Sequence, residues 1–156
     1  MELVRKYWVD EQKILGASNP STEILGELFN EGFRTVISLI AERLNPLNYD
    51  LDQIKQMGYT WHLIPVIDRH APTPEQIREF LRLLDESLNK GKVLIHCQGG
   101  SGRTGTMAAA YWISKGLTAN KAIARVREAN PLAVESPAQK ESLFWFEREV
   151  RDRGIV

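Results

Sequence analysis

Short apolar runs alternate with segments of helical periodicity along the first two thirds of the chain. The runs are rich in β-branched and aromatic residues, which predicts β-strands. They comprise residues 7–9, 13–17, 34–40, 59–67 and 93–95. Only a short polar segment around Asp10 and Glu11 separates the first two runs, so these two strands are expected to form a hairpin.

Other segments place apolar residues three or four positions apart, which predicts amphipathic helices. They comprise residues 22–30, 50–56, 74–88, 106–113, 119–130 and 136–151. Residues suited to capping a helix N-terminus are Ser21, Thr73, Thr118 and Ser136. Thr73 is followed by Pro74 and Gln76, which predicts a capping box. Residues 41–49, with Pro46 among them, predict no regular element.

This order of elements predicts an α/β fold in which a central, mainly parallel sheet is flanked by helices. A length of 156 residues is enough for one domain with a sizeable core. No repeat, low-complexity tract or linker divides the chain. We therefore expect a single domain over residues 1–156.

Composition and charge narrow the classes of function. Twenty basic and twenty acidic residues cancel, so charge-driven binding to nucleic acid or to a membrane surface is not expected. The N-terminal residues do not resemble a signal peptide, and no apolar run approaches the length of a membrane span. A single cysteine forms no disulfide within the chain, which favours a reducing, cytoplasmic setting.

The stretch from Val93 to Thr106 carries the candidate chemistry. An apolar strand enters a turn that contains Gly99, Gly100 and Gly102, and an apolar helix follows. Glycines let successive backbone N–H groups point at one oxyanion, and the start of a helix adds partial positive charge there. The strand, turn and helix together predict a binding site for an anion.

Cys97 precedes this turn and Arg103 closes it. A cysteine at the end of a strand is most often a small buried hydrophobe. Facing N–H groups and a guanidinium, however, its thiol is expected to ionise and become a nucleophile. Arg103 has the fork geometry that binds two phosphate oxygens at once. These residues predict nucleophilic attack by Cys97 on a phosphate ester.

The stretch resembles the signature of the cysteine-based protein tyrosine phosphatases, in which His-Cys, five residues and Arg are followed by Ser or Thr. Here it reads His96 and Cys97, then the loop, then Arg103 and Thr104. The loop residues are Gln98, Gly99, Gly100, Ser101 and Gly102, whose amides would bind substrate phosphate with Arg103. Length and element order are similar to those of the compact archaeal and eukaryotic dual-specificity phosphatases. The resemblance gives His96 a supporting role; simple packing at the strand end is the alternative.

Such chemistry also needs a proton for the leaving oxygen. Asp68 follows the strand that precedes the Cys97 strand, and it lies before Pro72, as the general acid does in the resembled family. The alternative is a solvated loop carboxylate. Its neighbours Arg69 and His70 are expected at the surface, where they would shape substrate choice; His70 is a minor alternative acid.

The resemblance implies two further roles, and position alone suggests a third. Thr104 would assist departure of the Cys97 thiolate from the phosphoenzyme, although it is also an ordinary residue for a helix start. Gln139 would position the hydrolytic water, although a glutamine on a helix is more commonly solvated. Glu42 could contact the reactive loop, but surface charge is the better interpretation.

These residues predict a phosphatase for phosphotyrosine and for phosphoserine or phosphothreonine in proteins or peptides. It would use a cysteinyl-phosphate intermediate and no metal or other cofactor. An RNA 5′-triphosphatase and a phosphoinositide phosphatase share the signature, but the loop lacks the lysine common in phosphoinositide-directed relatives. A catalytically dead phospho-binding module is a further alternative, disfavoured because Cys97, Arg103 and Asp68 are all present. The sequence predicts no oligomeric state.

Overall fold

The computed structural model describes residues 4–41 and 46–153. A five-stranded mixed sheet has the order β1-β2-β5-β3-β4. The strands are β1 (Lys6–Asp10), β2 (Ile14–Ala17), β3 (Phe33–Ile40), β4 (Thr60–Val66) and β5 (Lys92–His96). β1 pairs antiparallel with β2 as the predicted hairpin, and every other pair is parallel. The predicted α/β fold with a mainly parallel sheet is confirmed.

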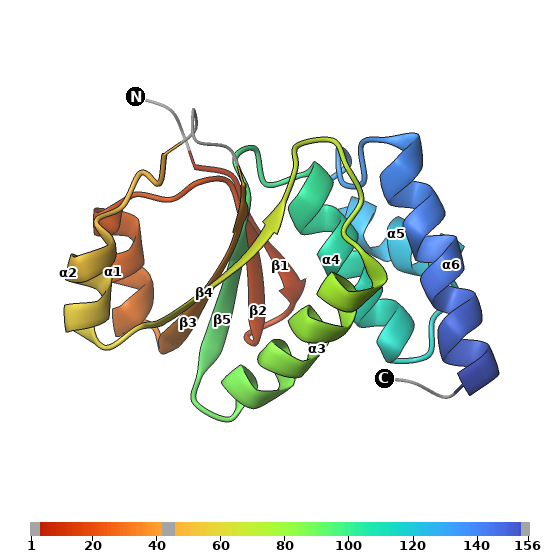
Figure 1. Ribbon diagram of the computed structural model, residues 1–156. Helices are drawn as coiled ribbons and strands as arrows, with labels where there is room; N and C mark the ends of the chain where they lie inside the picture. Colours follow the sequence, from red (N-terminus) through yellow and green to blue (C-terminus); the bar gives the residue numbers. More distant parts are fainter. Residues whose placement is uncertain (1–3, 42–45, 154–156) are drawn as a thin grey trace.

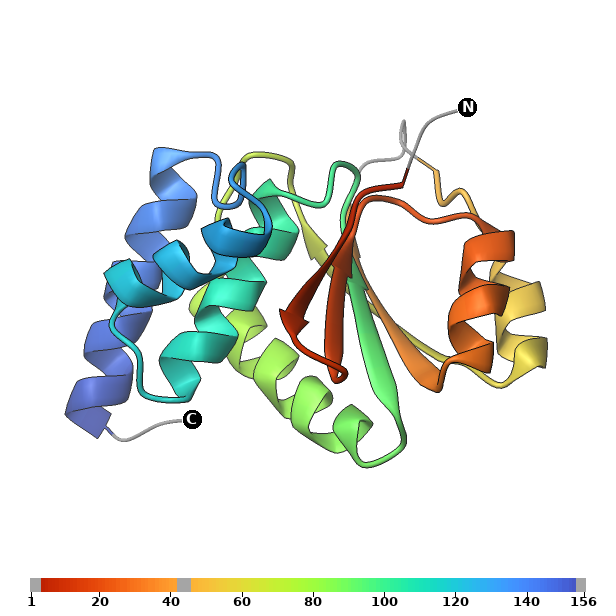
Figure 2. The same ribbon diagram turned by 180° about the vertical axis from the view of Figure 1, so that it is seen from behind.

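Helices cover both faces of the sheet (Figures 1 and 2). One face carries α1 (Thr22–Asn30) and α2 (Leu51–Met57). The other carries α3 (Pro74–Leu88), α4 (Gly102–Ser114), α5 (Ala119–Ala129) and α6 (Pro137–Arg153). In β5, Leu94 packs into the first layer and Ile95 into the second, so the strand is buried on both sides.

The helix starts follow the predicted caps. The side chains of Ser21, Asp50, Thr73 and Thr118 each accept a hydrogen bond from the backbone N–H three residues later. The capping box at Thr73 forms with Gln76. Asp50 is therefore the cap of α2 and not its first residue. Within the described ranges, none of the helices combines the length and the hydropathy needed to cross a membrane.

α4 begins at Gly102, four residues earlier than predicted from its apolar run. Its glycines disfavour a helix by propensity, but tertiary packing overrides propensity here because residues 102–113 are all buried. Gly105 is required by that packing, since a Cβ there would lie 2.7 Å from Ala133 Cβ. As a consequence Arg103 and Thr104 belong to the first turn of the helix.

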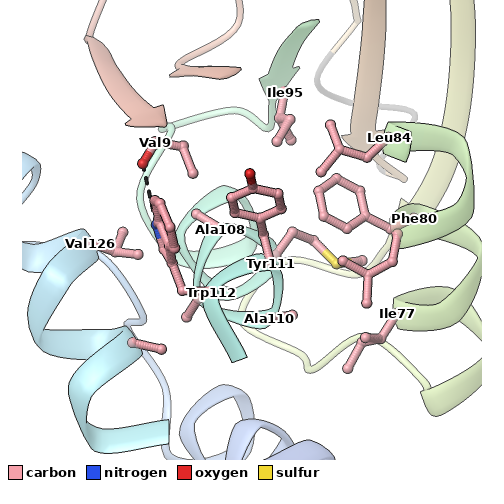
Figure 3. Packing of buried hydrophobic residues seen from close by; sticks show 14 of the residues in the cluster. Val9, Ile77, Phe80, Leu84, Ile95, Ala108, Ala110, Tyr111, Trp112 and Val126 are labelled. Carbon is pink, nitrogen blue, oxygen red and sulfur yellow. Dashed lines mark hydrogen bonds between the residues drawn. The ribbon is translucent and has the colours of Figure 1, made fainter. Parts of the chain in front are cut away.

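α4 lies in the middle of the second layer. Figure 3 shows Tyr111 and Trp112 of this helix between Phe80 of α3 and Val126 of α5. Trp112 Nε1–H donates to the carbonyl of Val9 in β1 over 3.2 Å, which ties the helix to the edge of the sheet. This contact holds the C-terminal end of α4 against the sheet, while Arg103 and Thr104 lie at its opposite end.

Three connections meet at the end of the molecule where β5 leads into α4 (Figure 1). They are residues 67–73 after β4, residues 97–101 after β5 and residues 130–136 between α5 and α6. Parallel strands deliver their following loops to the same edge of a sheet, which is where such folds bind ligands. The predicted site residues from distant parts of the sequence are carried by these connections and the helix starts that follow them.

Candidate active site

Cys97 follows directly after β5 and is 2% exposed. Its Sγ accepts a hydrogen bond from the backbone N–H of Gly100 over 3.2 Å. The sulfur therefore lies on the inner side of the loop, facing one of the amides expected to bind an anion. This is the arrangement that a nucleophile at the base of an anion site requires.

The turn depends on glycine at position 100. Gly100 has a φ of 80°, which is the left-handed region. A Cβ at this position would also lie only 2.6 Å from the backbone nitrogen of Ser18, which follows β2. Both the backbone conformation and the close approach of the neighbouring strand exclude a side chain at this position.

Side chains from distant segments hold the outer side of the loop. The Tyr7 hydroxyl donates to the Gly100 carbonyl over 2.8 Å, and Asn130 Nδ2 lies 3.4 Å from the same oxygen. Asn130 Nδ2 and Arg5 Nη1 also donate to Ser101 Oγ, at 3.2 and 2.5 Å. Burial is the largest cause that raises the pKa of Tyr7, so its hydroxyl stays a donor. The Gly100 carbonyl is thus held on the side away from Cys97, while its N–H faces the Cys97 sulfur.

His96 supports the loop through a hydrogen bond to the backbone of Cys97. Trp61 Nε1–H donates to the Tyr49 hydroxyl over 2.8 Å, and that hydroxyl lies 2.9 Å from His96 Nε2. Burial raises the pKa of Tyr49 to about 12, so the hydroxyl keeps its proton. We assign that proton to Nε2, which leaves Nδ1–H to donate to the Cys97 carbonyl at 3.3 Å. His96 thus orients the peptide that carries the nucleophile.

His96 is expected to be neutral in the folded protein. Burial lowers the pKa of His96 from 6.5 to about 4, and the nearby Arg103 guanidinium acts in the same direction. Between those two values the unfolded chain binds a proton that the folded chain does not. Stability therefore falls as the pH falls through this window, by about 1.4 kcal/mol per unit and about 3 kcal/mol in total from this group.

Denaturant unfolding at a series of pH values between 4 and 7 measures this effect. His96→Asn is expected to be less stable at neutral pH but to lose less stability on acidification than wild type, because it has no imidazole to protonate on unfolding. Parallel loss of stability in the two proteins would show that His96 does not carry this pH dependence.

Arg103 lies in the first turn of α4 and is 2% exposed. Its Nη1–H donates to the carbonyl of Val66 at the end of β4 over 2.9 Å. Its Nη2 lies 3.6 Å from Oδ1 of Asp68, whose side chain is 60% exposed. The structure therefore brings the predicted anion-binding arginine and the predicted general acid side by side.

Gln139 is fully buried, so the interpretation of this residue as a solvated glutamine is wrong. Its Oε1 accepts hydrogen bonds from the backbone N–H groups of Glu135 and Ser136, at 2.9 and 3.1 Å. Its Nε2 donates to the carbonyl of His70 over 3.3 Å. The carboxamide lies 3.2 Å from the position that a Cβ on Gly102 would take. Gln139 joins the start of α6 to the Asp68 loop beside the anion site.

The remaining predicted residues have differing surroundings. Thr104 Oγ1 is buried and, among the described residues, has no hydrogen-bond partner. Gln98 Oε1 accepts from Asn19 Nδ2 over 3.2 Å, which faces this side chain toward the loop after β2. A Cβ on Gly99 would meet no atom within 4 Å. Glu42 lies outside the described residues.

The Asp68 loop carries exposed polar residues, as predicted. Arg69 and His70 are both exposed, and Arg69 has a φ of 65°. His70 Nδ1 lies 3.0 Å from the carbonyl oxygen of Asp68. Within residues 4–41 and 46–153, no three His, Cys, Asp or Glu side chains gather as metal ligands do.

A family model for this arrangement covers most of the chain. The model described as "Tc-R-P: Polymorphic toxin system, DSP-PTPase phosphatase" matches residues 12–117, which include Asp68, Cys97 and Arg103. The chain belongs to the DSP-PTPase phosphatases. The family predicted from the Cys97 loop is thereby confirmed, and with it the class of cysteine-dependent phosphatase.

Individual phosphatases are similar to it over different extents. The tyrosine-protein phosphatase cdc-14 of Caenorhabditis elegans is 32% identical over 142 residues, 85% of this chain and 20% of that protein. The dual specificity protein phosphatase CDC14C of Homo sapiens is 32% identical over 111 residues, 67% of this chain and 24% of that protein. The chain thus spans about a fifth to a quarter of these relatives.

A solved phosphatase structure matches it nearly end to end. A crystal structure of a mutant form of Tk-PTP superposes with a TM-score of 0.85 at 33% identity. The match covers 94% of this chain and 96% of that one. The dual-specificity-phosphatase-like architecture implied by the family resemblance is confirmed by this likeness.

Several residues that support the DSP-PTPase loop were missed by sequence reasoning. Tyr49 contacts His96 and is itself held by Trp61, while Arg5, Tyr7 and Asn130 hold Gly100 and Ser101. No motif marks them, because each is distant in sequence from the group that it contacts. The Tyr49 and His96 side chains, for example, are 47 positions apart.

Proposed function

We propose that this chain hydrolyses phosphate monoesters of tyrosine, and of serine and threonine, through a cysteinyl-phosphate intermediate. The observation that carries the proposal is the sulfur of Cys97, which lies at the base of the loop with Gly100 N–H donating to it and Arg103 closing the same loop. The direct test is release of inorganic phosphate from an aryl phosphate by the purified chain.

In the first step the Cys97 thiolate attacks phosphorus and an S–P bond forms. The P–O bond to the leaving group breaks, and that oxygen takes the proton of the Asp68 carboxylic acid. The three other phosphate oxygens are held by the amides of residues 98–103 and by the Arg103 fork. The 3.6 Å distance between Asp68 and Arg103 supports an acid within reach of the bound phosphate.

In the second step the Asp68 carboxylate takes a proton from water, and the water oxygen attacks phosphorus. The S–P bond breaks, and Cys97 departs as a thiolate. Gln139 is proposed to orient this water, since its carboxamide lies beside Gly102 and contacts the Asp68 loop. Thr104 is proposed to donate a hydrogen bond from its hydroxyl to the departing sulfur. This role is supported by the burial of its Oγ1, which has no hydrogen-bond partner among the described residues.

Proteins or peptides are the proposed substrates. The relatives carry the names tyrosine-protein phosphatase and dual specificity protein phosphatase, which supports action on both classes of phosphorylated side chain. A panel of phosphotyrosine, phosphoserine and phosphothreonine peptides, phosphoinositides and 5′-triphosphate RNA tests this choice. Faster turnover of phosphoinositides or of 5′-triphosphate RNA would identify that class as the substrate in place of phosphopeptides. Binding without turnover would indicate a phospho-binding module.

Arg103→Lys tests the role of the guanidinium fork. Lysine keeps the positive charge but has a single ammonium group, which cannot reach the Val66 carbonyl and two phosphate oxygens together. We expect kcat/KM for an aryl phosphate to fall about 10²–10³-fold, the scale for losing a transition-state donor. Arg82→Lys, on the exposed face of α3, is the matched control and should retain wild-type rates. Near-wild-type activity of Arg103→Lys would contradict bidentate binding.

The proposed setting is the cytoplasm. Cys97 is the single cysteine of the chain, and the chemistry needs its thiol in the reduced form. A balanced charge of twenty basic and twenty acidic residues supports discrete phosphorylated partners over broad binding to nucleic acid or membranes. We further propose that residues 1–156 act as one phosphatase domain.

A further inference from the structure

A second carboxylate lies beside the loop of residues 97–103, here called the phosphate loop. It belongs to Glu135, in the connection between α5 and α6. A Cβ placed on Gly102 would lie 3.2 Å from both Cδ and Oε2 of Glu135. Because the amide of Gly102 is one of those proposed to bind the substrate phosphate, this carboxylate lies next to the proposed anion site.

A hydrogen bond from its backbone N–H holds Glu135 in place. This N–H donates to Gln139 Oε1 over 2.9 Å, and Gln139 Nε2 in turn donates to the His70 carbonyl in the loop of residues 67–73, here called the acid loop. The Glu135 carboxylate and the Gln139 carboxamide approach the same face of Gly102. Glu135 therefore lies where the phosphate loop, the acid loop and the start of α6 come together.

The Glu135 carboxylate is not paired with a cation within the described residues, although Arg127 Nη2 donates to the carbonyl of the preceding residue, Val134, over 3.0 Å. Among residues 4–41 and 46–153, no side chain forms a hydrogen bond or an ion pair with its oxygens, and the residue is exposed. The starts of α4 and α6 carry partial positive charge, which stabilises a carboxylate nearby. This partial charge does not cancel the full negative charge of Glu135, which an approaching phosphate dianion therefore meets.

Electrostatics then favours one kind of substrate. A phosphate dianion that enters the loop is repelled by the Glu135 carboxylate, and a further negative charge on the substrate adds to that repulsion. A positive side chain next to the phosphorylated residue offsets the repulsion by pairing with Glu135. An exposed carboxylate at the rim of a site thus discriminates between substrates through their flanking charges.

We propose that Glu135 selects phosphopeptides that carry a lysine or arginine next to the phosphorylated residue and disfavours those with an acidic neighbour. The inference rests on the proposed phosphatase function. Glu135 acts here as a specificity-determining residue, and it takes no part in bond formation or cleavage.

The test compares peptides that differ at one position. Phosphotyrosine peptides with Lys, Ala or Glu immediately before or after the phosphotyrosine are hydrolysed at low ionic strength. Wild type should show a kcat/KM about three- to tenfold higher for the better-placed Lys peptide than for its Glu counterpart, the scale of exposed charge pairs. Raising the salt concentration to about 1 M should remove most of the preference, because the Debye length shrinks to about 3 Å.

Variants assign the preference to this side chain. Glu135→Gln should bring the Lys-to-Glu ratio close to one, and Glu135→Lys should invert it. Glu128→Gln removes an exposed carboxylate from α5 and should keep the wild-type ratio. The ratio is the readout, because a purely structural role of Glu135 would change all peptides alike. A wild-type ratio near one, or a ratio unchanged in Glu135→Gln, overturns the proposal.

An aryl phosphate without flanking residues separates this inference from the function on which it rests. If wild type hydrolyses it through Cys97 and yet shows no charge preference among peptides, the role of Glu135 alone is wrong. If no Cys97-dependent hydrolysis occurs with any substrate, the proposed function and the inference both fail.

Discussion

Cys97→Ser is expected to lose hydrolysis of every substrate while still binding phosphate-like oxyanions. The loop amides and Arg103 remain in this variant, so the anion site is intact. A serine hydroxyl in place of the thiol, however, does not ionise near neutral pH and is a poor nucleophile. We expect a loss of at least about 10⁴-fold in kcat, the scale for removing a nucleophile that works as a unit with its neighbours.

Two measurements on Cys97→Ser distinguish lost chemistry from lost structure. Tungstate or vanadate binding, followed by the increase in melting temperature, should be close to that of wild type. Thermal unfolding without ligand should also be similar, because the change alters one atom in a buried side chain. Turnover comparable to wild type would exclude Cys97 as the nucleophile. Loss of oxyanion binding with the fold intact would contradict an anion site formed by the backbone.

The local part of this site could be predicted because its signals are local. An apolar β5, glycines in the turn and a helix after it together place Cys97 and Arg103 at the two ends of one short turn. The caps at Ser21, Thr73 and Thr118 are equally local, since each side chain bonds to an N–H three residues away. Interactions within a few residues depend little on how the rest of the chain folds.

The position of Asp68 could be predicted from the topology of the sheet. β4 and β5 run parallel, with β3 between them, so the loops after these two strands emerge at the same edge. The side chain of Asp68 then lies 3.6 Å from Arg103 although 35 positions separate the two residues in the sequence. A correct fold class was enough to bring the two together.

The surroundings of the loop could not be predicted, because they depend on packing between distant segments. Gln139 has the sequence context of an exposed helix start, yet the fold buries it against Gly102 and the acid loop. α4 begins early because burial on all sides outweighs the weak helix propensity of glycine. Tyr49 reaches His96 from a segment with no regular pattern in the sequence. Such contacts follow from the complete three-dimensional arrangement only.

Asp68→Asn is expected to lose activity in a way that depends on the leaving group. An asparagine has no proton to give to the departing oxygen, but it has nearly the same shape and leaves the loop between β4 and α3 in place. A phenol that is a strong acid leaves without protonation, so its phosphate ester should lose least in the first step. A tyrosyl or alkyl ester needs the proton and should lose about 10²–10⁴-fold in kcat/KM, the range for a positioned general acid.

A series of aryl phosphates of graded leaving-group acidity measures this dependence directly. In wild type, kcat/KM should vary little along the series, because Asp68 neutralises the departing oxygen. In Asp68→Asn it should fall steeply as the phenol becomes a weaker acid, since charge then accumulates on that oxygen. Asp85→Asn, on α3 and outside the site, is the matched control and should follow wild type. Equal dependence in wild type and Asp68→Asn would mean that another group donates the proton. His70, whose ring lies 3.0 Å from the Asp68 carbonyl, would then be the next residue to replace.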